Sequence, residues 1–218
     1  DVEKSFPPGT VLRLRSSTNN EDLDGFNGAG LYASRTFDPS APATSQRSGF
    51  ADVMKDVWSS LWSFRAVEER TFHKIDHFAT AMGVLVHPSY GDKEAIAGVA
   101  ISKNIYDPKG GGLYVNVQPG DDGVTSPDQG ARPEELLLRK DARTGRYEAH
   151  TLQRSSQSDG PLLTPQQHQQ LAAILEKIEA HFRGVYGKFG DDKFAMDVEF
   201  VVDNDTIRVV QARPWVDG

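Results

Sequence analysis

The chain has 218 residues, of which 38% are hydrophobic and 25% are charged, a composition typical of one large or two small globular domains. Its 24 Lys and Arg residues against 31 Asp and Glu residues give a net charge of −7, which disfavours a nucleic-acid-binding protein because such proteins are usually basic. The absence of cysteine excludes disulfides, a thiolate nucleophile and a cysteine zinc site, and no apolar run approaches the roughly 20 residues of a membrane helix, so we expect a cytoplasmic protein.

The first predicted strand covers residues 10–15. Arg13 and Arg15 fall on one face of it and two leucines on the other, because side chains alternate along a strand. A loop rich in Ser, Asn and Gly follows at residues 16–30. An arginine leading into such a loop offers charge, hydroxyl groups and backbone N–H groups to a phosphate, whereas the alternative is an ordinary surface loop. No Gly-Lys-Ser/Thr follows, so the loop is not a P-loop.

The strongest helical pattern begins near residue 50 and runs into the region that ends at 76–78. Its apolar residues recur at i, i+3, i+4 and i+7, and they are Phe50, Val53, Met54, Val57, Trp58, Leu61 and Trp62. We expect both tryptophans in the core, although exposed tryptophans would suit sugar stacking. The stripe continues through Arg65, which either extends to solvent or holds an anion. The charged residues between 68 and 74 are predicted to be a solvated face.

The middle of the chain predicts five strands and a second helix. Gly98 lies inside a predicted strand, which indicates a bulge or a close backbone contact. The helix begins at Thr164-Pro165, with the threonine as cap and the proline at the first helical position. The strands cover residues 82–87, 95–102, 113–117, 135–139 and 146–152. These elements predict an α+β fold in which a mixed or antiparallel sheet packs against two main helices.

The C-terminal region predicts a hairpin, with strands at 194–202 and 207–214 around a turn rich in Asp and Asn. One face of the first strand is apolar, whereas Asp197 and Glu199 lie on the other face. The register decides what lies opposite these carboxylates, because a one-residue slip exchanges the two faces.

We expect an odd loop at residues 203–205, which places Asp197 opposite Gln211. The two carboxylates then share a face with Gln211 and Arg213. An even loop would instead place apolar residues opposite the carboxylates. The odd register predicts a cluster of oxygen ligands suited to Mg²⁺, with Arg213 beside it for phosphate. The alternative is a solvated polar face.

Three separated segments together resemble one known family. They contain Leu14-Arg15-Ser16-Ser17 before the glycine-rich run, Trp62-Ser63-Phe64-Arg65-Ala66, and Asp197-Val198-Glu199-Phe200 with Gln211-Ala212-Arg213-Pro214. Their order and approximate spacing resemble the nucleotide-binding domain of pyruvate phosphate dikinase and phosphoenolpyruvate synthase, which has an ATP-grasp-like fold. The resemblance covers almost the whole chain.

The resemblance implies that six residues surround ATP and Mg²⁺. The residues implied to contact the nucleotide are Arg15, Arg65, Gln211 and Arg213. The residues implied to bind or orient the metal are Asp197, Glu199 and Gln211. Neither the pattern nor the resemblance assigns a catalytic residue.

The resemblance also implies how the chain is organised. We expect one ATP-grasp-like domain over residues 1–218 that corresponds to the C-terminal portion of the family domain, with subdomains 1–80 and 81–218. The family's Gly-Leu-Gly-Glu loop is replaced by Gln118-Pro119-Gly120-Asp121. The lysine-bearing segment that precedes Arg15 in the family has no counterpart here, and neither do the phosphohistidine domain and the pyruvate-binding barrel.

The resemblance implies the ATP- and Mg²⁺-binding portion of a kinase or other phosphotransferase. It would transfer phosphate from ATP to a histidine or a small acceptor, with the acceptor domain on another segment or chain, and the isolated chain would be incomplete for turnover. The alternative is a non-catalytic nucleotide-binding module or pseudoenzyme. A role like that of the glucan dikinases, which carry a similar domain, is less favoured. We expect no nucleic-acid or membrane partner.

Overall fold

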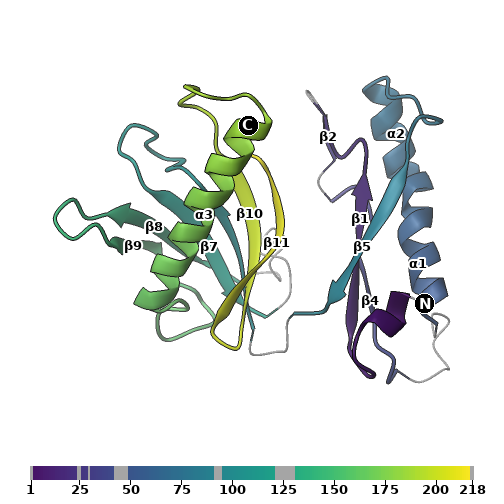
Figure 1. The fold of residues 1–218 in the computed structure, drawn as a ribbon, viewed down its shortest axis with the longest axis horizontal. Helices are drawn as coiled ribbons and strands as arrows, with labels where there is room; N and C mark the ends of the chain where they lie inside the picture. Colours follow the sequence, from purple (N-terminus) through teal and green to yellow (C-terminus); the bar gives the residue numbers. More distant parts are fainter. Residues whose placement is uncertain are drawn as a thin grey trace. The chain divides into compact units, whose positions relative to one another are not determined.

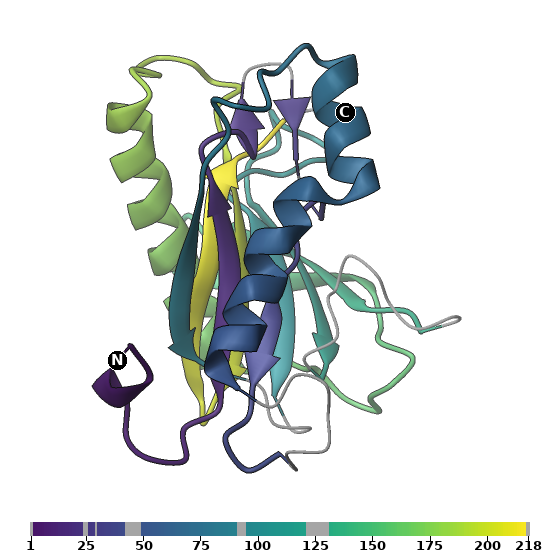
Figure 2. The ribbon, with the colours of Figure 1, turned by 90° about the vertical axis from the view of Figure 1, so that its right-hand side faces the viewer.

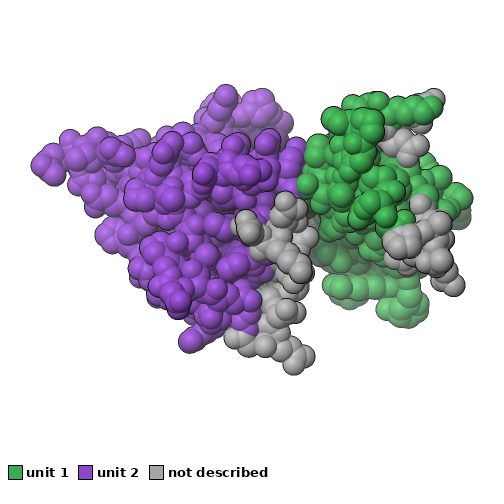
Figure 3. Space-filling view, turned by 90° about the horizontal axis from the view of Figure 1, so that it is seen from below, with its two compact units in different colours: residues 1–89 green, residues 90–218 purple. Residues whose placement is uncertain are grey.

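The chain divides into two compact units, Asp1–Ser89 and Tyr90–Gly218, which Figure 3 colours separately. The computed structural model describes residues 2–23, 26–28, 30–41, 49–90, 95–120 and 131–216. Each unit has its own sheet and its own core. Within the described ranges, no helix is both long enough and apolar enough to cross a membrane.

Unit 1 is built on a three-stranded antiparallel sheet in which β1 lies between β4 and β5. Leu12 and Leu14 of β1 are buried against Val53 and Val57 of α1, and Figure 2 shows α1 lying along this face of the sheet. Arg13 and Arg15 alternate with these leucines, as the sequence predicts. The elements before the helices are η1 (Val2–Ser5), β1 (Leu12–Thr18), β2 (Asp22–Leu23), β3 (Phe26–Asn27) and β4 (Arg35–Phe37).

The sheet of unit 1 is completed by β5 (Met82–Pro88), which pairs with the whole length of β1. This strand lies beyond residue 80, so unit 1 includes a strand that the expected subdomain 1–80 leaves out. The pairing is antiparallel, and it places Arg13 opposite His87 and Arg15 opposite Leu85. Residues from both strands therefore share the face that α1 does not cover.

The predicted long helix is divided into α1 (Phe50–Ser59), the single 3₁₀ turn η2 (Ser60–Trp62) and α2 (Phe64–Phe72). Ser63 has an extended backbone, and its hydroxyl accepts a hydrogen bond from the Ala66 N–H at 3.3 Å. The 3₁₀ turn has fewer residues per turn than an α-helix, and Ser63 begins a new helix as its N-cap. The 3.6-residue periodicity of α1 is therefore lost before α2 starts.

The structure corrects the expectation that both tryptophans are in the core: Trp58 is exposed within α1 itself, and Trp62 lies in the 3₁₀ turn that follows. Trp58 is 50% exposed and Trp62 is 55% exposed. Arg65, which continues the apolar stripe in the sequence, is exposed on α2. Ala66 is the residue of α2 that packs into the core instead.

Arg70 corrects the expectation of a solvated face at residues 68–74, because its side chain is completely buried. The guanidinium donates hydrogen bonds to the Leu61 carbonyl at 2.7 Å, to the Tyr32 hydroxyl at 3.2 Å and to His77 Nδ1 at 3.2 Å. It also lies over the Trp62 ring, 5.7 Å from the ring centre. Three neutral acceptors on different segments replace the water that a buried cation has lost, so Arg70 connects these segments.

We predict that Arg70→Lys lowers the free energy of unfolding of unit 1 by about 2–4 kcal/mol, because an ammonium group cannot reach acceptors in three directions and leaves buried partners unsatisfied. Arg65→Ala is the control, and since Arg65 is exposed we expect a change within about 0.5 kcal/mol. Chemical denaturation followed by fluorescence of Trp58 and Trp62 measures both. Equal, small losses for the two variants would contradict this role for Arg70.

Unit 2 contains a six-stranded antiparallel sheet in the order β11-β10-β6-β7-β8-β9. Figure 1 shows the single long helix, α3, crossing one face of it. The Thr164 hydroxyl accepts from the Gln167 N–H while the Gln167 side chain accepts from the Thr164 N–H, which confirms the predicted helix start. The elements are β6 (Ile96–Ile101), β7 (Leu113–Pro119), β8 (Glu134–Lys140), β9 (Tyr147–Gln153), α3 (Pro165–Val185), β10 (Met196–Asp203) and β11 (Thr206–Pro214).

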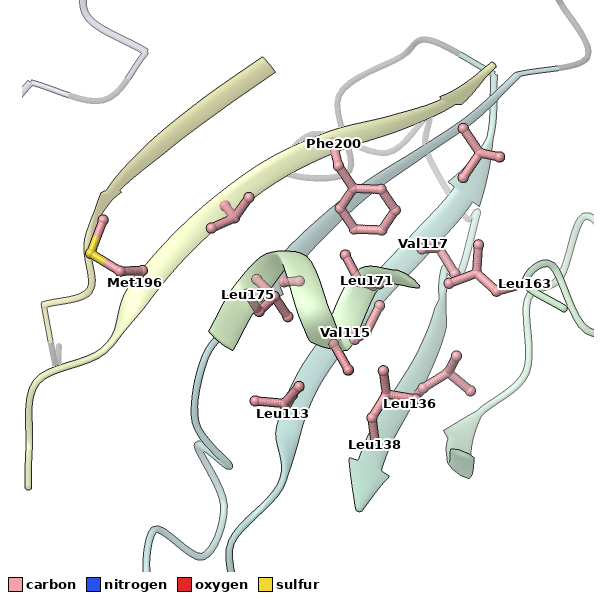
Figure 4. Close-up of a cluster of buried hydrophobic side chains, with 14 residues drawn as sticks. Leu113, Val115, Val117, Leu136, Leu138, Leu163, Leu171, Leu175, Met196 and Phe200 are labelled. Carbon is pink, nitrogen blue, oxygen red and sulfur yellow. The ribbon is translucent and has the colours of Figure 1, made fainter. Parts of the chain in front are cut away.

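The core of unit 2 lies between α3 and the sheet. Figure 4 shows Leu171 and Leu175 of α3 among apolar side chains from the strands, including Phe200. The alternate residues of β10 that share a face with Phe200 are buried here, as the sequence predicts, and they are Met196, Val198 and Val202. The opposite face of β10 carries Asp197 and Glu199, so α3 does not cover these carboxylates.

The Phe200 ring lies directly over the backbone of Gly98 in the neighbouring strand. A Cβ atom on Gly98 would lie 2.6 Å from Phe200 Cε1 and 2.8 Å from Val117 Cγ1, closer than real Cβ contacts come. The predicted close approach at this glycine is therefore confirmed, and its cause is the packing of a core aromatic ring.

We predict that Gly98→Ala destabilises unit 2 by about 1–3 kcal/mol, because the added methyl group forces Phe200 and Val117 apart in a packed core. Gly160→Ala is the control, since nothing lies within 4 Å of the position of its Cβ. The measurement is the midpoint of chemical denaturation. Phe200→Leu in the Gly98→Ala background should cost less than the sum of the two single changes, and strict additivity would argue against the contact.

Candidate functional site

The hairpin of β10 and β11 is closed by a two-residue turn. Asn204 and Asp205 both have positive φ angles, of 47° and 61°, and Asp203 pairs with Thr206. Positive φ at both central residues is typical of a type I′ turn, which matches the twist of paired strands. The expected odd loop at 203–205 is therefore wrong, because an Asn-Asp pair tolerates the conformation that the shorter turn requires.

A β-bulge nevertheless brings the polar residues together. The register shifts between Glu199 and Phe200, so that Phe200 pairs with Val209 and Glu199 pairs with Gln211, leaving Val210 as the extra residue. The shift also places Asp197 opposite Arg213. Without the bulge, an even loop would place apolar residues opposite both carboxylates. The expectation that the four polar residues share one face is confirmed, but the register differs from the expected one.

Asp197 and Arg213 form a largely buried ion pair. Arg213 Nε and Nη2 donate to Asp197 Oδ2 at 3.0 and 2.9 Å, and the two side chains are 19% and 8% exposed for Arg213 and Asp197 respectively. On its other side Asp197 pairs with Ile101 of β6, which belongs to a small apolar cluster with Tyr114 and Ala195. A carboxylate beside such a cluster needs a close cation. The ion pair fixes the orientation of Arg213, whose guanidinium carries further N–H groups.

Glu199 and Gln211 lie directly opposite each other, and both are partly buried. Residues that pair across antiparallel strands have Cβ atoms about 4.5–5.5 Å apart, so a carboxylate oxygen and an amide oxygen can reach one cation. This donor set fits Mg²⁺, which commonly takes one or two carboxylates and completes its shell with water and phosphate oxygens. In the part of the chain that the structure describes, no three His, Cys, Asp or Glu residues form a metal-binding group.

Arg15 belongs to unit 1, on the face of β1 that α1 leaves uncovered. Arg13 and His87 lie on this face too, and Arg13 Nη1 donates to Thr36 Oγ1 at 2.8 Å. Burial lowers the pKa of His87, and the charges of Arg15 and Arg13 lower it further, while a bond to the Pro88 carbonyl acts in the opposite direction. We call Arg13, Arg15 and His87 the cationic face of unit 1.

Sequence reasoning placed His87 in a predicted strand but did not identify it as a candidate site residue. The strand 82–87 was predicted, but its pairing partner was not, and only the pairing with β1 places His87 opposite Arg13. The structure does not place Arg65 with the cationic face: it is an exposed residue of α2. Part of the glycine-rich run, and Asp121 in the altered Gly-Leu-Gly-Glu segment, lie outside the described residues.

A protein-family model matches almost the whole chain. The model of the family described as "Pyruvate phosphate dikinase, AMP/ATP-binding domain" matches residues 2–216. The matched range includes both units, the cationic face and the hairpin. The two larger antiparallel sheets and two main helices, one of them bent, agree with the ATP-grasp-like nucleotide-binding fold expected for this family. The chain therefore belongs to the pyruvate phosphate dikinase AMP/ATP-binding domain family and is an AMP/ATP-binding module of that kind.

Proposed function

We propose that the chain is the ATP- and Mg²⁺-binding portion of a phosphotransferase related to phosphoenolpyruvate synthase and pyruvate phosphate dikinase. The phosphate of ATP would pass to a histidine or a small acceptor carried by another segment or chain. The observation that carries this proposal is the bulged pairing of β10 with β11, which gathers two carboxylates, an amide and an arginine on one face of the sheet. Family membership makes ATP the nucleotide to test first.

Glu199 and Gln211 would hold Mg²⁺ together with oxygens of the nucleotide. When bound, the ion would neutralise phosphate charge, which is the main requirement of phosphoryl transfer. Asp197 holds Arg213 in a fixed orientation, so that the remaining N–H groups of the guanidinium are available to a phosphate oxygen. In this proposal Asp197 orients Arg213 and is not a direct ligand of the metal.

The cationic face supports a phosphate contact for Arg15. The protein has a net charge of −7, so it does not attract a nucleotide through its overall charge and must rely on local cations. Burial is the main cause of the lowered pKa of His87, and the charges of Arg15 and Arg13 add to it, so both cations act at this face. Arg65 is proposed as a further phosphate contact because it is exposed and because its segment resembles the family.

We predict that Glu199→Gln weakens the Mg²⁺-dependent part of ATP binding about tenfold, which is roughly 1.4 kcal/mol, because the substitution removes the only charge in the proposed ligand pair. Isothermal titration calorimetry with ATP, with and without Mg²⁺, measures this difference. Asp192→Asn, in an exposed loop of the same unit, is the matched control. An equal gain from Mg²⁺ in the wild type and in Glu199→Gln would reject a metal role for Glu199.

We predict that ATP raises the pKa of His87, because phosphate groups near Arg13 and Arg15 would offset the positive charges that now lower it. The His87 ring signal in an NMR pH titration reports the pKa, and the exposed His181 of α3 is the internal control. Arg15→Gln should raise the His87 pKa in the free protein and weaken ATP binding. An unchanged His87 pKa at saturating ATP would place the phosphates away from the cationic face.

A second candidate is a carbohydrate-related role, as in the glucan dikinases, which carry a similar domain. The observation that favours it is the exposure of Trp58 and Trp62, which are four residues apart and half-exposed where core packing was expected. The Mg²⁺ dependence of binding distinguishes the two candidates, since sugar stacking needs no metal. A non-catalytic nucleotide-binding module would bind ATP in the same way but would release no product.

A further inference from the structure

Unit 2 contains a cavity of about 510 Å³ between β8, β9 and the start of α3. This volume lies within the range of small-molecule sites, about 300–1,000 Å³. Sheet order places β9 at one edge and β11 at the other, and the cavity lies on the face that α3 covers. It is therefore separate from the polar face of the β10–β11 hairpin and lies outside the proposed nucleotide contacts.

The cavity is largely apolar. Leu136 and Leu163, which line it, also belong to the main core of unit 2. Ala149 lies opposite Leu138 of the core, so its methyl group is on the cavity side of β9, and by alternation the side chain of Glu148 is on the other side. Pro161 and Pro165 complete the apolar lining. A ligand that fills this space must have an apolar body.

His168 is the polar residue of the cavity that the fold does not satisfy. It lies near the start of α3, is 8% exposed, and its Nε2 atom is buried without a hydrogen-bond partner in the described part of the chain. Burial lowers the pKa of His168, and the charge of Glu134 only partly opposes this effect, so the ring is neutral at pH 7. A buried polar atom without a partner is unfavourable, because it has lost its hydrogen bonds to water without replacing them. A ligand group that hydrogen-bonds with Nε2 would compensate for this loss.

Arg154 also lines the cavity and carries a positive charge. Glu134 is completely buried, and it accepts from Arg154 Nη1 at 2.8 Å with one oxygen and from the Leu162 N–H at 2.8 Å with the other. Both Glu134 oxygens are thus satisfied, whereas only one nitrogen of the guanidinium is used by this pair. Arg154 and His168 both line the cavity, as does Glu134, which contacts Arg154.

We infer that this cavity is a second ligand site, which binds a small organic carboxylate with an apolar body. The N–H groups of Arg154 that do not contact Glu134 and the Nε2–H of His168 hold the carboxylate. Leu136, Ala149 and Leu163 enclose the apolar body. An apolar space with a few convergent polar groups is the usual composition of a small-molecule site.

The test is an NMR titration of the full chain with phenylacetate, hexanoate and, as the neutral match, phenylacetamide. We expect saturable binding of both carboxylates below about 20 mM, with shifts at His168 and along β9, and affinity at least about fivefold weaker for the amide. Ala149→Phe, which fills the cavity from an exposed strand position, should weaken phenylacetate binding about tenfold or more. His150→Phe, on the opposite face of the same strand, should leave it unchanged.

His168→Phe keeps the size of the ring and removes the hydrogen bond, so we expect it to weaken phenylacetate binding about fivefold or more. Arg154→Lys keeps the charge beside Glu134 and should weaken binding less than His168→Phe does. The inference is overturned if neither carboxylate saturates, if the amide binds as tightly as the acid, or if Ala149→Phe binds phenylacetate like the wild type. None of these readouts requires ATP, so they are independent of the proposed nucleotide function.

Discussion

The polar face of this protein depends on one extra residue in β11. Val210 has no partner in β10, and the resulting bulge moves the remainder of the strand by one position. Because side chains alternate, this shift decides whether Asp197 and Glu199 face apolar residues or face Arg213 and Gln211. The buried ion pair between Asp197 and Arg213 then satisfies a carboxylate that would otherwise be isolated beside an apolar cluster. Turn, bulge and ion pair therefore support a single register.

Both units use the two faces of a sheet for different purposes. One face is covered by a helix and forms the core, through α1 in unit 1 and α3 in unit 2. The other face carries the charged residues, which are the cationic face on β1 and β5 and the hairpin carboxylates on β10. A rigid apolar layer behind each set holds the polar side chains in fixed positions, which electrostatic binding of a phosphate requires.

Several polar side chains are buried and so depart from this division between an apolar core face and a charged outer face. Arg70 is surrounded by three neutral acceptors, and its network holds the bent helical region against Tyr32 and His77. Glu134 is satisfied by Arg154 and a backbone N–H. His168 differs from both, because the residue lines a cavity and its buried Nε2 atom has no hydrogen-bond partner in the described ranges. Complete satisfaction of Arg70 and Glu134 indicates a structural role, whereas the unsatisfied nitrogen of His168 beside a cavity points to a ligand.

The sequence by itself determined the elements and their faces. Alternation identified the apolar side of β10 and the arginines of β1, and the Thr164-Pro165 pair identified the start of α3, because these signals depend on neighbouring residues alone. Tertiary structure decided the register of the hairpin, since the conformation of a turn and a bulge are not encoded in periodicity. It also decided the exposure of Trp62, because the helix is interrupted at residues 60–63, and the burial of Arg70, because partners distant in sequence meet only in the folded chain.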